Sequence, residues 1–179
     1  ILPAFGRDPR VRRVLLVGCA PYTQHYPGLL PAAVAWTIDA DPKLKRYGAM
    51  RHVVAPLQDL RAHDTDGSFD LIVCNGVLGW GLDAPHDIER AMRACHDALH
   101  EDGWLLLGWN DYHPRNRVRP EQIAALGAFE HSSYAGLPPR MFEQNRLQVD
   151  LVDAVRRLHR RPAGVREMWR RRQRPLGTR

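Results

Sequence analysis

The chain has 179 residues, 44% of them hydrophobic and 8% aromatic, a composition typical of one globular domain with a short appendage. It contains no run of about 18 or more apolar residues, which excludes a membrane-spanning helix. The net charge of +6 is unevenly distributed: residues 155–179 hold ten arginines and one glutamate, whereas the other 154 residues hold 16 basic and 19 acidic side chains. The body of the protein is therefore mildly acidic.

The first strong pattern is the apolar run 14–17, which ends at Gly18 and continues as a turn of small residues, Cys19 and Ala20. Four consecutive branched aliphatic residues predict a strand that is buried on both faces, as in the centre of a parallel sheet. Gly18 permits a sharp turn and the close approach of a ligand to the backbone. A strand followed by a glycine turn is the layout in which open α/β sheets bind nucleotide-like ligands.

A second strand is predicted over 33–39, and it ends at Asp39. An acid at this position can accept hydrogen bonds from both ribose hydroxyls of a bound nucleoside. Asp39 also suits an Asx turn or a helix cap, because Asp41-Pro42 follows. A third strand is predicted over 51–54.

The next segments repeat this alternation. A turn over 65–68 precedes a fourth strand over 69–76, a helix begins at 83–85 and ends at 101–103, and a fifth strand covers 104–109. Strands and helices joined by short links are typical of right-handed crossovers and a parallel sheet. The predicted fold class is therefore α/β: a single Rossmann-like, doubly wound, mostly parallel sheet with helices on both faces.

Beyond residue 111 the pattern is weaker. Residues 120–126 are compatible with a helix, and 129–134 and 141–149 with two strands that pair with each other. The predicted organisation is a lead-in segment over 1–13, the α/β domain over 14–150, and an Arg-rich C-terminal helix and tail over 151–179. We expect the tail to be partly disordered, because its few apolar residues cannot offset chain entropy.

The residues at the ends of these strands, with 67–75 and 99–105, resemble class I S-adenosylmethionine-dependent methyltransferases, especially small bacterial ones of the type 11 kind. The resemblance covers about residues 13–111. It implies that S-adenosylmethionine is the cofactor and that the following residues bind it: Gly18, Cys19 and Ala20 at the methionine part, Asp39 at the ribose, Pro56 and Leu57 at the adenine, and Asn75 and Gly76 at the methionine end that faces the substrate.

Two features depart from the family pattern. The first turn has fewer glycines than is usual, and Ala55 stands where an acid that receives the adenine amino group is expected. Asp59 is a later candidate for that role. These departures favour one alternative reading, a catalytically inactive interaction module with the methyltransferase fold.

The resemblance implies methyl transfer, and we expect a small-molecule acceptor because the acidic body would repel nucleic acid. His25 and His113 are candidate general bases, each with the alternative reading of an ordinary loop residue. Trp80 and Tyr26 are also expected on the substrate side.

Two further alternatives remain: an RNA methyltransferase recruited by the basic tail, and a nicotinamide-dependent Rossmann enzyme. The adjacent pair Cys95-His96 lacks metal-ligand spacing, so no metal site is predicted. The three cysteines, Cys19, Cys74 and Cys95, are predicted to be buried free thiols, which favours a cytoplasmic location. No membrane partner is expected, because the chain has no long apolar run.

Overall fold

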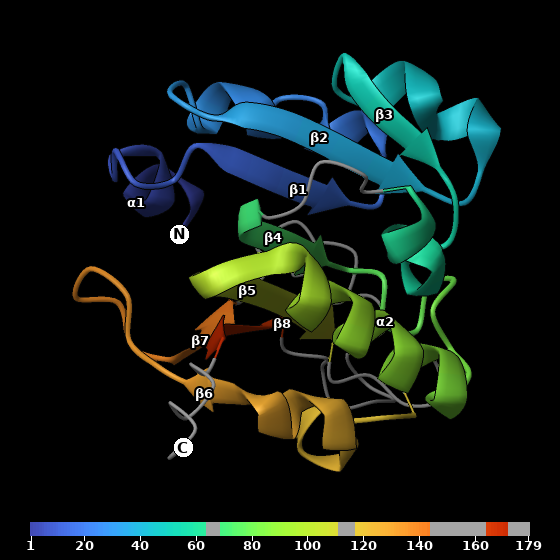
Figure 1. The fold of residues 1–179 in the computed structure, drawn as a ribbon, viewed down its shortest axis with the longest axis vertical. Coiled ribbons are helices and arrows are strands. Elements are labelled where there is room, and N and C mark those ends of the chain that lie inside the picture. The colour runs from blue at the N-terminus through green and yellow to red at the C-terminus, as the bar shows by residue number, and fades with distance from the viewer. Residues whose placement is uncertain (64–68, 111–116, 144–163, 172–179) are drawn as a thin grey trace, which may run out of the picture.

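A computed structural model describes residues 1–63, 69–110, 117–143 and 164–171, whose strands form one twisted sheet (Figure 1). The parallel strands are β1 (Arg13–Val17), β2 (Val34–Asp39), β3 (Arg51–Val54), β4 (Phe69–Asn75) and β5 (Leu99–Asn110), and they lie in the order β3-β2-β1-β4-β5. The antiparallel strands are β6 (Phe129–His131), β7 (Arg140–Glu143) and β8 (Gly164–Arg171). β8 pairs with β5 on one side and with β6 and β7 on the other. The predicted α/β fold with a mostly parallel sheet is confirmed.

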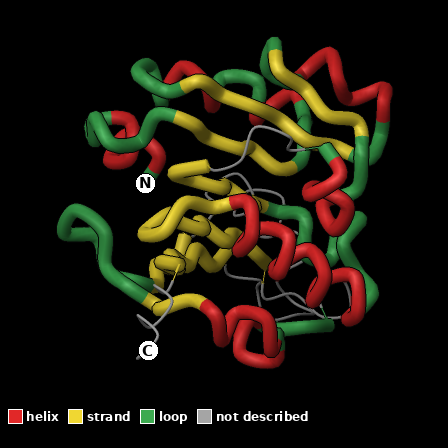
Figure 2. Tube along the Cα trace, in the orientation of Figure 1, coloured by secondary structure: helices red, strands yellow, loops and turns green. Residues whose placement is uncertain are grey.

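The helical segments are short, apart from α2 (Figure 2). They are α1 (Leu2–Gly6), α2 (Pro85–Ala98) and the 3-10 segments η1 (Pro21–Thr23), η2 (Tyr26–Leu29), η3 (Pro42–Tyr47), η4 (Leu57–Ala62), η5 (Pro120–Gln122) and η6 (Ala124–Ala128). The chain proceeds from β1 toward β3 on one side and from β4 toward β5 on the other. The carboxyl ends of β1 and β4 therefore flank the point where the winding direction changes, where open α/β sheets bind their ligands.

The alternating side chains of β1 explain why both faces of the sheet are covered. Leu15 and Val17 belong to the apolar cluster that includes residues of η4, α2 and η6, whereas Val14 and Leu16 belong to the cluster that includes residues of α1. All four side chains are buried, as the sequence predicted for a central parallel strand. No described helix has the length and apolar character to cross a lipid bilayer.

The C-terminal half differs from the prediction in three places. Residues 164–171, expected in the tail, form β8 inside the sheet, where Met168 is buried and Arg170 pairs with Asp102 at 2.7 Å. β7 pairs with β8, whereas we expected it to pair with residues 129–134. β5 begins at Leu99, because a register shift in its pairing with β4 accommodates the left-handed residue Asp102 (φ 67°).

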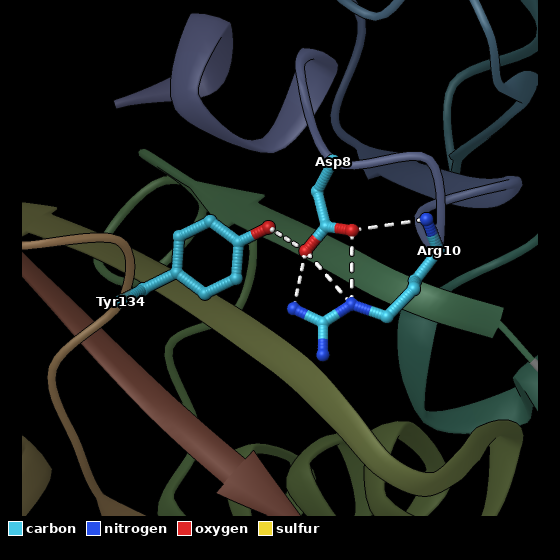
Figure 3. A network of polar contacts seen from close by, with 3 residues as sticks. All are labelled: Asp8, Arg10 and Tyr134. Carbon is cyan, nitrogen blue, oxygen red and sulfur yellow. Dashed lines mark hydrogen bonds and ion pairs between the residues drawn. The ribbon is translucent and has the colours of Figure 1, made fainter.

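The lead-in segment is part of the core. The ring of Phe5 is fully buried and stacks on Tyr134 with 3.8 Å between ring centroids. The Tyr134 hydroxyl donates to the Asp8 carboxylate at 2.9 Å, and Arg10 binds the same carboxylate through its guanidinium and its backbone N–H (Figure 3). The hydrogen bonds from Arg10 hold the pKa of Asp8 well below its usual range. Burial, together with the hydrogen bond to Asp8, raises the pKa of Tyr134.

Tyr134→Phe tests the link between the lead-in and the sheet. Loss of a hydrogen bond to a charged group is expected to lower the free energy of unfolding by about 1–2 kcal/mol at pH 7. Because the Asp8 pKa is depressed in the folded state, the difference from wild type is present above the unfolded pKa of about 3.9 and shrinks as the pH falls below it. Denaturant unfolding between pH 2 and 7 measures it, and exposed Tyr22→Phe is the control. Equal stabilities at pH 7 would contradict it.

Candidate cofactor and active site

A crevice of about 650 Å³ lies along the carboxyl ends of the parallel strands. Its walls come from the turn after β1, from the ends of β2, β3 and β4, and from Asn110 at the end of β5. The eight residues predicted to bind the cofactor all line it: Gly18, Cys19, Ala20, Asp39, Pro56, Leu57, Asn75 and Gly76. The topology therefore brings together residues that are far apart in the sequence.

The carboxylate of Asp39 joins the end of β2 to the turn after β1. Its Oδ2 accepts a hydrogen bond from the Cys19 backbone N–H at 2.7 Å, and its Oδ1 accepts one from the Asp41 N–H at 2.8 Å. Asp39 therefore forms the Asx turn that was the alternative prediction, and its carboxylate also connects the end of β2 to the turn after β1. A carboxylate offers about four acceptor positions, so two of them remain available to a ligand.

The turn after β1 approaches the loop after β4 closely. Gly18 has a left-handed backbone (φ +82°), and a Cβ atom at this position would lie 3.0 Å from Cγ1 of Val77. Its N–H donates to the carbonyl of Ile38 at 2.9 Å, which continues the β1–β2 pairing into the turn. A side chain at this position would be strained by its backbone and would also press against the opposite wall.

A small polar cluster supports this turn from beneath. Nδ1 of His52 lies 2.8 Å from the Thr37 hydroxyl and 4.0 Å from Sγ of Cys19. The Thr37 hydroxyl also accepts the backbone N–H of Ala49 at 3.0 Å. Burial lowers the pKa of His52, with the nearby Asp39 opposing this effect and Lys45 adding to it. Burial also raises the pKa of the Cys19 thiol, which is consequently a poor nucleophile.

The part of the crevice next to β3 is apolar with one amide. Pro56 and Leu57 line it, as expected, together with Gln58, which sequence reasoning missed. Asp59, the later candidate for the missing acid, does not line the crevice, because its carboxylate pairs with Arg90 of α2 at 2.9 Å. The signal in the sequence that could have identified Gln58 is its position directly after the predicted pair Pro56-Leu57.

Of the groups expected on the substrate side, Asn75 and Trp80 line the part next to β4, whereas Tyr26 does not line the crevice. Nδ2 of Asn75 donates to the Tyr26 hydroxyl at 3.3 Å. Trp80 lines the crevice, as expected. Asn110 and Tyr22 also line it, although they were not predicted there. His25 does not line it: this exposed side chain packs edge-on against Tyr26. The other candidate base, His113, lies outside the described residues.

The sequence profile of the family described as "Methyltransferase domain" matches residues 16–107, just over half of the chain. This match covers β2, β3 and β4, the end of β1 and most of β5, so it includes every residue found to line the crevice except Asn110.

The chain belongs to the class I S-adenosylmethionine-dependent methyltransferases.

The trans-aconitate 2-methyltransferases of Mycobacterium tuberculosis and Mycobacterium bovis are each 28% identical to this chain over 130 residues, which is 72% of this chain and 47% of theirs. The chain thus spans about half the length of the curated relatives it matches. Among solved structures, N-methyltransferase NodS from Bradyrhizobium japonicum has a TM-score of 0.63 at 18% identity, covering 91% of this chain and 87% of that one. A TehB-like methyltransferase from Corynebacterium glutamicum has a TM-score of 0.61 at 21% identity, covering 96% and 88%. These structures support the fold.

Gly18→Ala tests the close approach at the first turn. The left-handed backbone and the contact with Val77 are expected to lower the free energy of unfolding by roughly 1–2 kcal/mol. Gly28→Ala is the matched control, because a Cβ there meets nothing within 4 Å, and it should leave stability unchanged or slightly raised. Thermal and denaturant unfolding measure both variants. An equal effect of the two substitutions would refute the special role of Gly18.

His52→Gln tests the polar cluster. Because the folded state disfavours the imidazolium, the pKa of His52 is lowered, and wild-type stability should decline as the pH falls below the unfolded pKa of about 6.5. The variant should lose this part of the pH dependence. Denaturant unfolding between pH 5 and 8 measures the slope, with the exposed His86→Gln as the control. A variant slope identical to wild type would show that His52 is not its source.

Proposed function

We propose that this methyltransferase binds S-adenosylmethionine in the crevice, through Gly18, Asp39 and the residues beside them, and transfers its methyl group to a small molecule. The observation that carries the proposal is the bonding of the Asp39 carboxylate. It accepts the backbone N–H of Cys19 from the turn after Gly18 and that of Asp41, and it keeps acceptor positions for a ligand. Binding and alignment of donor and acceptor are then the main tasks of the protein.

The chemistry of the lining residues suits this cofactor. Asp39 would accept the two ribose hydroxyls, as charged acceptors make stronger hydrogen bonds than neutral ones. Pro56 and Leu57 would cover the adenine, and the Gln58 amide offers a polar group where Ala55 provides none. The turn at Gly18 leaves room for the methionine part. The crevice volume of about 650 Å³ is in the range of small-molecule binding sites, and it is larger than the volume that a single polar fragment would fill.

The bound cofactor would supply an electrophilic methyl group on a sulfonium. Since this leaving centre is already positively charged, alignment and exclusion of water can provide most of the acceleration. Asn75, fixed by Tyr26, would orient groups at the β4 end. His25 is not assigned a role in the reaction, because the structure does not bring it to the crevice.

A small molecule is favoured over nucleic acid as the acceptor. The charged residues among the described lining are the acids Asp39 and Asp41, which would repel a phosphate backbone. The curated relatives carry the name of a small-molecule methyltransferase, which supports the same class of acceptor. Within the basic segment, Arg170 is paired with Asp102.

Asp39→Asn tests the proposed cofactor site. The substitution removes a charged acceptor, and it should weaken binding of S-adenosylhomocysteine by about tenfold or more in calorimetry. The matched control is Asp70→Asn, since Asp70 also accepts two backbone N–H groups, those of Arg12 and Arg13 at 2.8 Å, but does not line the crevice. Asp70→Asn should leave the affinity unchanged. Absence of binding by wild type at millimolar ligand would favour the inactive module.

A further inference from the structure

The loop after β4 presents one aromatic ring to the crevice. It runs Gly76-Val77-Leu78-Gly79-Trp80-Gly81-Leu82, and its three glycines all have a left-handed backbone, with φ of +74°, +81° and +108°. Leu78 and Leu82 are buried and anchor the loop in the core, whereas the side chain of Trp80 is 54% exposed. The buried leucines on both sides of Trp80 thus hold the loop on the core, while about half of the Trp80 side chain stays exposed at the crevice.

Backbone hydrogen bonds hold the loop in this shape. The carbonyl of Val77 accepts the N–H of Trp80 at 3.0 Å and that of Leu82 at 3.1 Å. The N–H of Gly81 donates to the Asp83 carboxylate at 3.3 Å. A ring presented from a bonded loop is positioned before a ligand arrives, which lowers the entropic cost of binding.

A second aromatic side chain, Tyr22, lines the same crevice. Tyr22 comes from η1, after β1, and it is 65% exposed. Two large aromatic side chains this exposed within one crevice leave apolar surface for a ligand to cover. The strand order places β1 beside β4, so both rings belong to the end of the crevice away from β3.

The polar groups at this end are uncharged. Asn75 and Asn110 provide neutral amides, and the acids Asp39 and Asp41 follow β2, on the other side of β1. No lysine, arginine or histidine is found among the residues that line the crevice in the described ranges. Cationic donors make the strongest hydrogen bonds to carboxylates, and the described wall offers none for a polycarboxylate.

We infer that the methyl acceptor is an uncharged molecule with a flat ring, bound against Trp80 and Tyr22 and oriented by the amides of Asn75 and Asn110. This inference rests on the proposed function and specifies its acceptor. Ring faces stack offset or edge to face on aromatic side chains, and amides donate to or accept from a ring hydroxyl. Trp80 is then a specificity-determining residue, and a tricarboxylate such as trans-aconitate is a poor acceptor.

Calorimetry on the protein saturated with S-adenosylhomocysteine tests the inference. The probes are 2-naphthol, which is flat and neutral, its saturated counterpart decahydro-2-naphthol, and trans-aconitate. We expect 2-naphthol to bind most tightly of the three. Trp80→Ala should weaken its binding by about tenfold, and Trp80→Phe should retain most of the affinity. Met50→Ala, which truncates a fully exposed side chain that does not line the crevice, is the control and should have no effect.

The outcomes separate this inference from the proposed function. Binding of S-adenosylhomocysteine reports on the cofactor site alone, and Trp80→Ala should leave it unchanged. If wild type binds S-adenosylhomocysteine but prefers trans-aconitate or decahydro-2-naphthol to 2-naphthol, the acceptor class is wrong while the proposed function stands. Equal 2-naphthol affinity in wild type and Trp80→Ala likewise overturns the role of Trp80. If S-adenosylhomocysteine does not bind at all, the proposed function itself fails.

Discussion

The hydrogen bond from the Cys19 backbone to the Asp39 carboxylate is the constraint on which the crevice depends. It joins the turn after β1 to the end of β2, and the second oxygen of Asp39 binds Asp41 in the same way. Without it, the left-handed turn at Gly18 would have no partner on the neighbouring strand beyond the carbonyl of Ile38. Two of the acceptor positions of one carboxylate thus fix the backbone, and two are left for a ligand, which under the proposed function is the ribose.

The parallel half of the sheet could be predicted because its determinants are local. β1, β2 and β4 are short, mainly apolar runs that stop at a turn or polar residue, and parallel strands place those stops at one edge. The residues predicted for the cofactor therefore line one crevice once the strand order is formed. Gln58 and Asp41 were not predicted as lining residues, because the roles expected in these loops were already assigned to their neighbours. Only the folded loops show which side chains line the crevice.

The C-terminal half could not be predicted because its determinants are not local. β8 lies in a segment dominated by arginine, and its place in the sheet depends on β5, more than 50 residues earlier in the chain. Its buried side chain, Met168, gives a weak signal on its own. β6 and β7 follow the same edge of β8 in succession, and the excursion between them carries Tyr134 to Phe5 and Asp8. The lead-in and the antiparallel strands therefore stabilise each other (Figure 3).

The two ends of the crevice are built by different means, and this difference bears on what each end does. Around Asp39 and Gly18, backbone N–H groups, strand pairing and the Asp39 carboxylate set the shape, so substitutions other than those of Gly18 and Asp39 are expected to change it less. Next to β4, backbone hydrogen bonds hold the loop, but side chains make the lining: Trp80 on this loop, and Asn75, which is bonded to the Tyr26 hydroxyl. A cofactor common to a family suits a site made by the backbone, whereas an acceptor that differs between members suits one made by exchangeable side chains. Under the proposed function, acceptor specificity is therefore expected in the loop after β4 and in η1, and the fold itself would set only where the methyl group is presented.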